Sequence, residues 1–343
     1  MIYLDNAATT VCKFPASTYD DIWGNANTPY KFGRKARELA DECRKKVREC
    51  LGVKDGKVIF CGNASEAAKI LCDRLQGYGI ATACSPYEHD SVYNLVDIEG
   101  YQFVHYSNRT AFFQQWVNPV TGTIFDIHSI RQALGNDCFL CMDATAGIGK
   151  RILTQSIISS VDAIWFSGHK FNGPKTGGIL WVSDRLSKAL YLSDDSRNEY
   201  GLKHGTLDVP SFIATTCALE YTVAKGVENM WHYVELNNYL SNRAENKITS
   251  SKQYANYQLD ATVLIDTGCN ADVLVQYLSS KGIYVGLAHS ACSADANYRV
   301  TQAFGISKET AERCIRVSFS EDSTFNDIDA LVDGIKEFKE KFV

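Results

Sequence analysis

Features that mark several protein classes are missing from this sequence. Its 343 residues include no apolar run long enough to span a membrane. The formal net charge of −5 provides no broad basic surface for nucleic acid. The N-terminal residues MIYLD are strand-like and acidic, unlike a secretory signal. We therefore expect a cytoplasmic protein that binds neither nucleic acid nor a membrane.

Motifs for metal and dinucleotide binding are lacking as well. The 12 cysteines are scattered, without the recurring spacing of a zinc ribbon. Cys138 and Cys141 form a lone CxxC, but the Phe and Leu between them favour a buried strand with inert thiols. No GxGxxG opens a helix after the first strand, which disfavours a dinucleotide-binding fold. We expect no metal site, and free thiols in a reducing compartment.

Apolar runs alternate with helical patterns between about residues 40 and 240. The chain is longer than a single hydrophobic core usually accommodates, which predicts two domains. Alternation of strands and helices argues for a parallel sheet with helices on both faces. The expected helices are 38–51 and 64–75, and the expected strands are 57–60, 79–83, 139–142, 163–166 and 179–182.

The pattern changes after about residue 244, where a polar break precedes a smaller α+β unit. This unit is expected to hold strands 261–265, 283–285 and 315–319 and helices 270–281, 309–314 and 325–342.

The most informative segment is SGHKFNGPK, residues 167–175, which directly follows an apolar strand. It brings Lys170 to a turn bounded by Gly and Pro, beside Ser167 and His169. A lysine held in this way can form a Schiff base with a carbonyl cofactor, while the neighbouring donors hold a phosphate.

Asp143 ends another apolar strand, in CMDATAG. Ligands of open α/β sheets bind beyond the carboxyl ends of the strands. A carboxylate there can pair with a pyridinium nitrogen and keep it protonated. Taken alone, Asp143 could equally be a helix cap or a turn residue, but Lys170 at the end of the next strand favours the cofactor role.

Together these motifs resemble the class V, fold-type I enzymes that depend on pyridoxal 5′-phosphate (PLP), and most closely the NifS-type cysteine desulfurases. The resemblance covers nearly the whole chain, with the motifs in the family's order. It implies an α/β fold whose large domain, residues 12–244, has a mostly parallel seven-stranded sheet between helices. Residues 1–11 and 245–343 would form the small α+β domain.

The resemblance also implies a role for each cofactor-binding motif. Lys170 would carry PLP, and His89, in PYEHDSV, would stack on the ring and move protons. GNASEA resembles the family's phosphate loop, so Ala64 and Ser65 would join Ser167 and His169 at the phosphate. Thr206, in KHGTLDVP, would reach the phosphate of a partner subunit, which implies a homodimer with shared active sites.

The residues implied at the substrate come from four further segments. Cys292, in SACS, would take the sulfur of cysteine, although one loop cysteine among twelve can also be incidental. Arg316, in IRVSF, would grip the substrate carboxylate, or else form a structural ion pair. Asn6, in YLDNAATT, and Asn118 would approach the substrate. His289 precedes the SACS motif where the family has Gly; it would lower the thiol pKa or simply be exposed.

The implied activity is conversion of cysteine to alanine, with sulfur passed to an acceptor protein. Three residues depart from the family pattern: Ala146 replaces a Gln, Pro119 an Asn, and Lys203 an Arg. These departures leave two alternatives open. One is a class V aminotransferase or lyase acting on another small amino acid, and the other is a non-catalytic scaffold. The sequence does not separate cysteine from selenocysteine as substrate, nor name the sulfur acceptor.

Overall fold

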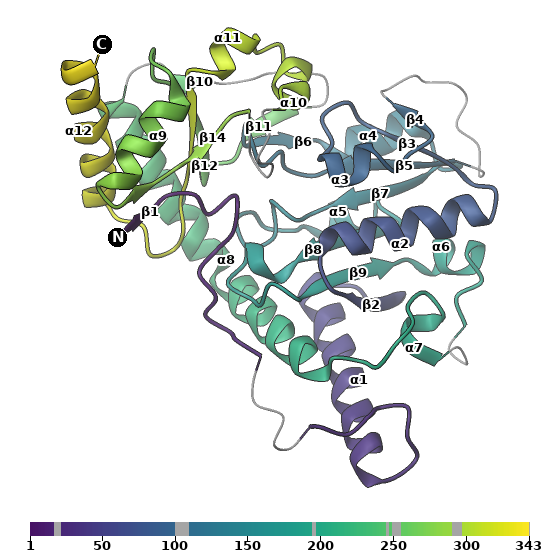
Figure 1. Cartoon of the computed structure of the whole chain (residues 1–343). Helices are drawn as coiled ribbons and strands as arrows, with labels where there is room; N and C mark the ends of the chain where they lie inside the picture. Colours follow the sequence, from purple (N-terminus) through teal and green to yellow (C-terminus); the bar gives the residue numbers. More distant parts are fainter. Residues whose placement is uncertain are drawn as a thin grey trace. The chain divides into compact units, whose positions relative to one another are not determined.

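The computed structural model describes residues 1–16, 22–99, 110–193, 197–244, 247–248, 255–289 and 297–342 (Figure 1). The chain forms two compact units. One comprises residues 11–116 and 127–225, and the other residues 1–10, 117–126 and 226–343. Compared with the expected domains, the segment 117–126 groups with the smaller unit, and the boundary near the long helix lies at residue 225 rather than 244.

The larger unit is built on a seven-stranded sheet. All neighbouring strands pair in parallel except at one strand, β9, which is antiparallel to both of its neighbours. The mostly parallel sheet predicted from the sequence is therefore confirmed. In spatial order the strands are β2 (Lys57–Cys61), β9 (Gly178–Val182), β8 (Ala163–Ser167), β7 (Phe139–Asp143), β5 (Thr110–Gln115), β3 (Ala81–Cys84) and β4 (Ile98–Glu99).

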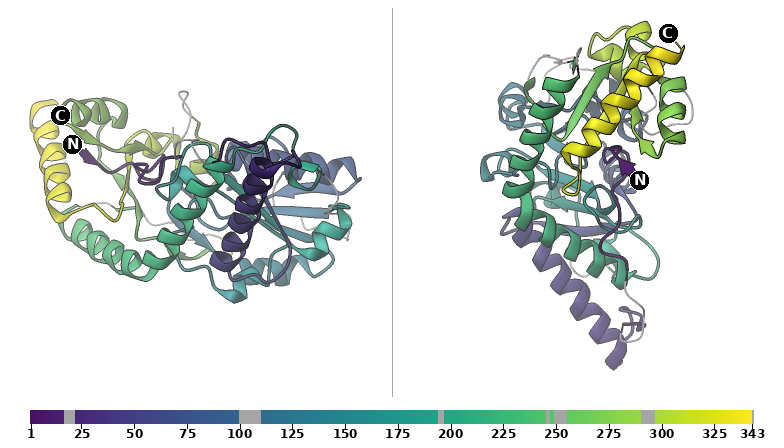
Figure 2. Two further views of the ribbon diagram at one scale, coloured as in Figure 1. Left: turned by 90° about the horizontal axis from the view of Figure 1, so that it is seen from below. Right: turned by 90° about the vertical axis from the view of Figure 1, so that its left-hand side faces the viewer.

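Helices cover both faces of this sheet. Successive side chains of a strand point to opposite faces, so two neighbouring residues of one strand show which helix lies on each face. Ile59 of β2 packs in a core with Leu71 and Leu75 of α2, whereas the adjacent Phe60 stacks on Phe212 of α8, with ring centroids 4.1 Å apart. The helices of this unit are α1 (Lys31–Leu51), α2 (Ala64–Gly77), α3 (Asp90–Tyr93), α4 (Ile127–Leu134), α5 (Gln155–Ile158), α6 (Asp184–Ala189), α7 (Arg197–Tyr200) and the first part of α8 (Val209–Arg243). Figure 2 shows α1 and α8 side by side, and an ion pair of 3.3 Å joins Lys46 to Glu220.

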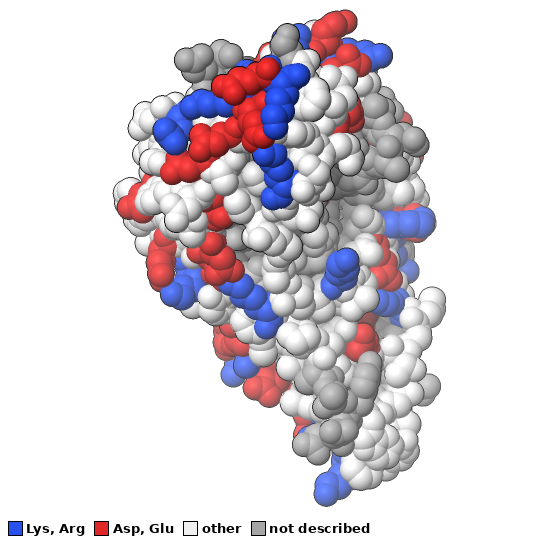
Figure 3. Space-filling model, turned by 60° about the vertical axis from the view of Figure 1, so that its left-hand side comes forward, with Lys and Arg blue, Asp and Glu red and all other residues white. Residues whose placement is uncertain are grey.

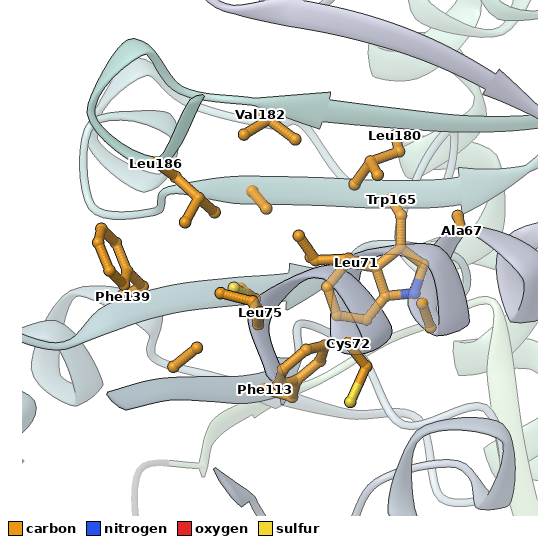
Figure 4. Packing of buried hydrophobic residues seen from close by; sticks show 14 of the residues in the cluster. Ala67, Leu71, Cys72, Leu75, Phe113, Phe139, Trp165, Leu180, Val182 and Leu186 are labelled. Carbon is orange, nitrogen blue, oxygen red and sulfur yellow. The ribbon is translucent and has the colours of Figure 1, made fainter. Parts of the chain in front are cut away.

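The core beneath α2 is continuous across the sheet (Figure 4). Leu71 and Leu75 lie among Phe113, Trp165 and Leu180, from three different strands, and all five are fully buried. Burying one such side chain contributes about 1.5–3 kcal/mol. Because helices cover both faces of the sheet, the strands bury apolar side chains on both faces. Polar side chains occur mainly where the strands end.

The smaller unit has a four-stranded antiparallel sheet, as expected for an α+β arrangement. Helix α9 packs on α12, where the ring centroids of Tyr277 and Phe338 are 5.3 Å apart. Figure 1 shows both chain ends in this unit, with β1 (Ile2–Tyr3) paired to β13 (Ile283–Tyr284). The sheet order is β10 (Lys247–Ile248), β12 (Thr262–Asp266), β15 (Cys314–Ser318) and β14 (Gly286–Leu287); β6 (Thr123–Phe125) pairs with β11 (Ala255–Gln258), and the helices are α9 (Ala271–Ser280), α10 (Arg299–Ala303), α11 (Lys308–Ala311) and α12 (Phe325–Phe342).

Two expected helices differ in extent. Helix α1 begins at residue 31 rather than 38, because Gly33 allows it to pack closely against Thr28; a Cβ on Gly33 would lie 2.1 Å from the Thr28 hydroxyl. The helix expected at 309–314 ends at Ala311, since Cys314 pairs with Asp266 in the sheet.

Charged side chains of both signs are interspersed on the face shown in Figure 3. On the smaller unit, for example, Glu337 pairs with both Lys281 and Lys341. In the described part of the chain, none of the helices combines the length and apolarity needed to cross a bilayer.

Candidate cofactor site

Two predicted cofactor residues lie at the carboxyl ends of neighbouring parallel strands. Asp143 is the last residue of β7, and Lys170 closes a short 3₁₀ turn (Gly168–Lys170) directly after β8. In the register of β7 with β8, Asp143 pairs with Trp165. Both Asp143 and Lys170 are buried, at 9% and 8% exposure. The sheet therefore brings together a carboxylate and an amine that are 27 residues apart in the sequence.

The turn after β8 is held by backbone hydrogen bonds. Gly168 N–H donates to the carbonyl of Gly177 at 2.5 Å, and Gly173 N–H donates to the carbonyl of Gly168 at 2.9 Å. A Cβ on Gly168 would lie 3.1 Å from the carbonyl oxygens of Gly177 and Pro174, a tight contact that favours glycine there. Ser167 Oγ, which enters this turn, is buried and has no hydrogen-bond partner within the described part of the protein.

The electrostatics of Asp143 suit a cationic partner. Burial raises the pKa of its carboxyl group, against hydrogen bonding from Thr145 and the charges of His89 and Lys170. The backbone N–H of Thr145 donates to Asp143 Oδ1 at 2.8 Å. A cation bound beside the carboxylate would offset the cost of burying its charge.

His169 lies in a cationic environment. Burial lowers its pKa to about 4, with further lowering by Lys170, Lys150 and Lys175. Its imidazole is therefore neutral at neutral pH and can donate one ring N–H. Lys150 itself is buried, at 5% exposure, and adds positive charge to this side of the site.

The predicted phosphate loop opens α2 with a side-chain cap at Asn63 and a further hydrogen bond to the residue before it. Asn63 Oδ1 accepts a hydrogen bond from Glu66 N–H at 2.9 Å, and the Glu66 carboxylate accepts one from Gly62 N–H. The first N–H groups of a helix have no intrahelical acceptor, so those of Ala64 and Ser65 are available to an anion. Asn63 is thus the helix cap, which explains why it can stand where the family has Gly.

Lys203 and Thr206 lie in the segment before α8. Lys203, which replaces a family Arg, lies 3.4 Å from Glu66 Oε1. Thr206 is exposed. The capping residue Glu66 therefore joins the phosphate loop to this segment.

His89 caps α3. Its Nδ1 accepts a hydrogen bond from Ser91 N–H at 3.1 Å and lies 2.9 Å from Ser91 Oγ. Because Nδ1 accepts a backbone hydrogen, the neutral ring is assigned a proton on Nε2. The side chain is half-buried.

Arg316 lies in the smaller unit, in β15, and is 1% exposed. Its Nη2 is 2.6 Å from Asp5 Oδ1, and Nη1 donates to the carbonyl of Pro119 at 3.3 Å. Its Nε is buried without a hydrogen-bond partner among the described residues. Gly286 makes room for the guanidinium, since a Cβ there would lie 2.8 Å from Nη2. The ion-pair alternative for Arg316 is therefore confirmed, and Nε is the nitrogen that has no protein partner among the described residues.

Both asparagines expected near the substrate have structural contacts. Asn6 Nδ2 donates to the carbonyls of Tyr3 and Ser318, at 3.2 and 3.0 Å. Asn118 Oδ1 accepts from the N–H groups of Val120 and Thr121, both at 2.9 Å. Each side chain therefore holds a backbone turn.

Cys292 and its SACS motif lie outside the described residues. His289, which precedes the motif, is buried at 3% exposure, so the exposed alternative is wrong. Its Nε2 lies 3.2 Å from Asp272 Oδ2, and its ring centroid is 5.3 Å from that of Tyr298. The backbone N–H of Asn297 donates to the carbonyl of His289 at 2.6 Å.

The lone CxxC is buried, with Cys141 in strand β7 and Cys138 directly before it. Cys138 and Cys141 are fully buried, and burial raises both pKa values, that of Cys138 to about 12. Among the residues that the structure describes, no group of three His, Cys, Asp or Glu is arranged to hold a metal ion.

A cavity of about 1030 Å³ lies at the opposite edge of the sheet, where β7 and β8 begin. Its buried carboxylate, Asp162, accepts hydrogen bonds from Arg131 at 2.7 Å and from Leu140 N–H at 3.0 Å. Protein donors thus already satisfy this carboxylate.

Sequence reasoning missed a buried polar cluster beside the site. Glu88, Gln114 and Gln115 are 0–2% exposed, and Gln115 pairs with Asp143 across β5 and β7. The available signal was the pair of glutamines that ends an otherwise apolar strand.

Comparison with known proteins agrees with this arrangement. The family model described as aminotransferase class-V matches residues 2–102 and 105–331. "Cysteine desulfurase IscS" of Buchnera aphidicola (subspecies Acyrthosiphon pisum, strain APS) is 28% identical, over 95% of this chain and 90% of that protein. "Putative cysteine desulfurase NifS" of Bacillus subtilis (strain 168) is 27% identical, over 97% and 93% of the two chains.

Solved structures show the same fold. A "NIFS-LIKE PROTEIN" superposes with a TM-score of 0.81 at 23% identity, over 99% of both chains. A NifS-like protein from Rickettsia africae gives a TM-score of 0.80 at 20% identity, again over 99% of both. The fold-type I architecture expected from the sequence is therefore confirmed.

Proposed function

We propose, because the chain belongs to the aminotransferase class-V family, that it is a PLP-dependent cysteine desulfurase. The observation that carries this proposal is the buried pair of Asp143 and Lys170 at the ends of two parallel strands. The reaction would convert L-cysteine and the thiol of Cys292 to L-alanine and a persulfide on Cys292. This sum balances without an external oxidant, since the carbon that loses sulfur gains hydrogen.

The residues present fit the cofactor. Ser167 Oγ is a buried hydroxyl in need of a partner, and His169 is a neutral donor two residues further along the chain. With Ala64 and Ser65 they would hold the phosphate, and Asp143 would face the ring nitrogen. When bound, PLP supplies an electron sink for negative charge at the substrate α-carbon.

Side chains of the protein would supply proton transfer, contact with the ring and binding of the substrate carboxylate. The Lys170 amine would take the α-proton of the substrate and return it. The half-buried His89 would lie against the ring and donate through Nε2. Arg316 would bind the substrate carboxylate through its unpartnered Nε, and Asn6 and Asn118 would border the same group.

We further propose a homodimer in which Thr206 reaches the phosphate of the partner subunit. Its exposure, on a segment tied to the phosphate loop through Lys203 and Glu66, supports this assignment. A sulfur-acceptor protein would then collect the persulfide. Light scattering on the purified protein measures whether it forms a dimer. A lower affinity of Thr206→Ala for PLP would test the contact of Thr206 with the phosphate.

The deciding experiment measures sulfide and alanine release by the purified, PLP-loaded protein. Cysteine should yield both products in equal amounts in the presence of a thiol reductant. Cys292→Ser should retain PLP and lose the protein-bound persulfide. Turnover of other small amino acids without sulfide would instead indicate an aminotransferase or lyase, and absence of any turnover would indicate a scaffold.

A further inference from the structure

The turn that carries His89 is fastened to the end of β5 by a set of buried hydrogen bonds. Ser85 N–H donates to the carbonyl of Phe113 at 3.2 Å. The carboxylate of Glu88 accepts the backbone N–H of Gln115, and the side-chain amide of Gln115 donates to the carbonyl of Tyr87. The two segments therefore hold each other reciprocally, side chain to backbone in both directions. We call this set of contacts the Glu88 clamp.

The clamp is dry. Glu88 and Ser85 are 0% exposed, and Gln115 is 2% exposed. Ser85 Oγ also donates to Glu88 Oε1, at 3.4 Å. Burying a carboxylate is costly even when it is hydrogen-bonded, and a neutral acceptor would satisfy one backbone N–H at lower cost. The stability of the turn alone thus gives no reason for a carboxylate at this position.

The position of the clamp provides a reason. Gln115 is paired with Asp143 in the register of β5 with β7, so the N–H that Glu88 binds adjoins the proposed ring-nitrogen partner. His89 follows Glu88 directly, and it is one of the residues whose electrostatic interaction acts on the pKa of the Asp143 carboxyl. Glu88 therefore joins the backbone beside Asp143 to the backbone of His89.

We propose that Glu88 is a positioning residue that fixes the His89 imidazole relative to the Asp143 carboxylate. It acts through the backbone N–H of Gln115, while the Gln115 side chain secures the same turn at Tyr87. The catalytic consequence rests on the proposed function, because it requires His89 to face bound PLP. The effect of Glu88 on the position of the His89 imidazole does not require the cofactor.

The test uses three variants and one matched control. Glu88→Ala removes the acceptor, Glu88→Gln retains an oxygen that can accept the Gln115 N–H, and Gln115→Leu removes only the side-chain half of the clamp. The control is Asp162→Asn, which alters another buried carboxylate that binds a strand N–H, at the opposite edge of the same sheet. Each protein is examined by thermal unfolding, by NMR of the His89 ring, by visible circular dichroism of bound PLP, and by turnover of cysteine.

Glu88→Ala should move the His89 ring resonances toward unfolded values and reduce the circular dichroism of PLP at least about twofold. Its kcat should fall about tenfold or more with little change in KM, because a small displacement of a catalytic group is costly. Glu88→Gln should recover most of each signal, and Gln115→Leu should show smaller changes of the same sign. Asp162→Asn should lose thermal stability while the His89 and PLP signals stay unchanged.

The proposal is overturned if Glu88→Ala and Gln115→Leu behave like Asp162→Asn, with lower melting temperatures and unaltered His89 and PLP signals. Failure of the proposed function looks different, since the unmodified protein would then lack PLP binding or sulfide release. Even in that case, the His89 resonances of the cofactor-free variants decide whether Glu88 fixes the imidazole.

Discussion

Arg316 and Asp5 are separated by 311 residues, yet Nη2 of the arginine lies 2.6 Å from Oδ1 of the aspartate. The arginine is 1% exposed, whereas the aspartate side chain is 23% exposed. The guanidinium is thus buried and directed by a partly exposed carboxylate, with Nε left over. Arg316 was expected either to bind the substrate carboxylate or to form a structural ion pair. The two roles are compatible, because a structural pair can orient a ligand-binding group.

Asp5→Asn should destabilise the protein and weaken substrate binding. Removing one partner of a buried ion pair costs about 3 kcal/mol or more of unfolding free energy. Because the guanidinium then loses its fixed direction, KM for cysteine should rise. Urea unfolding and steady-state kinetics measure the two effects.

The matched control for Asp5 is Asp266→Asn, which breaks the pair of Asp266 with Arg313 in the same unit, 2.8 Å apart. Arg313 is 39% exposed, in contrast to the fully buried Arg316, so breaking its pair should cost about 1 kcal/mol or less, without a change in KM. A lower KM in Asp5→Asn would mean that Asp5 competes with the substrate rather than orienting Arg316.

Lys170 should be the sole attachment point of PLP. The loaded protein should be yellow, and borohydride should bleach the colour while fixing the cofactor to one peptide. Mass mapping should place the adduct on Lys170 and not on the nearby Lys150 or Lys175. An adduct on either neighbour, or none, would contradict the assignment.

His169 should make the cofactor-free protein sensitive to mild acid. Its folded-state pKa of about 4 lies below the ordinary value of about 6.5. Between these values the unfolded chain binds a proton that the folded chain does not, so the unfolding free energy falls as the pH drops from about 6.5 to about 4. Below about pH 4 both states carry the proton, and the contribution of His169 no longer changes.

Urea unfolding at pH 7.5 and pH 5 checks this contribution. His169→Asn should lose less stability than the unmodified protein between the two values. His204→Asn, at an exposed position before α8, should keep the original loss. Equal losses in all three proteins would show that His169 binds protons alike in both states.

Ala146→Gln should lower the pKa of the visible chromophore that PLP forms with Lys170. Ala146 is half-buried, and the prediction holds for a glutamine side chain that fits there. The family's amide would donate to the ionised ring hydroxyl, and a hydrogen bond to the charged form favours that form. A spectral pH titration of both proteins measures the change; an unchanged or raised pKa would mean that another donor already serves the hydroxyl.

The sequence by itself determined the features that depend on neighbouring residues. The Gly-bounded turn around Lys170, the Asn63 cap of α2 and the strand that ends at Asp143 all follow from local patterns, because turns, caps and alternation involve residues a few positions apart. The parallel sheet followed from strand–helix order, and strand order in turn predicted that Asp143 and Lys170 meet at one edge.

Only the tertiary structure decided the pairings between distant residues. No local pattern joins Asp5 to Arg316, or Glu88 to the backbone of Gln115, since each pair depends on how strands register and on which charges become buried. A buried charge must find a partner wherever the fold brings one, and that partner can come from any part of the chain.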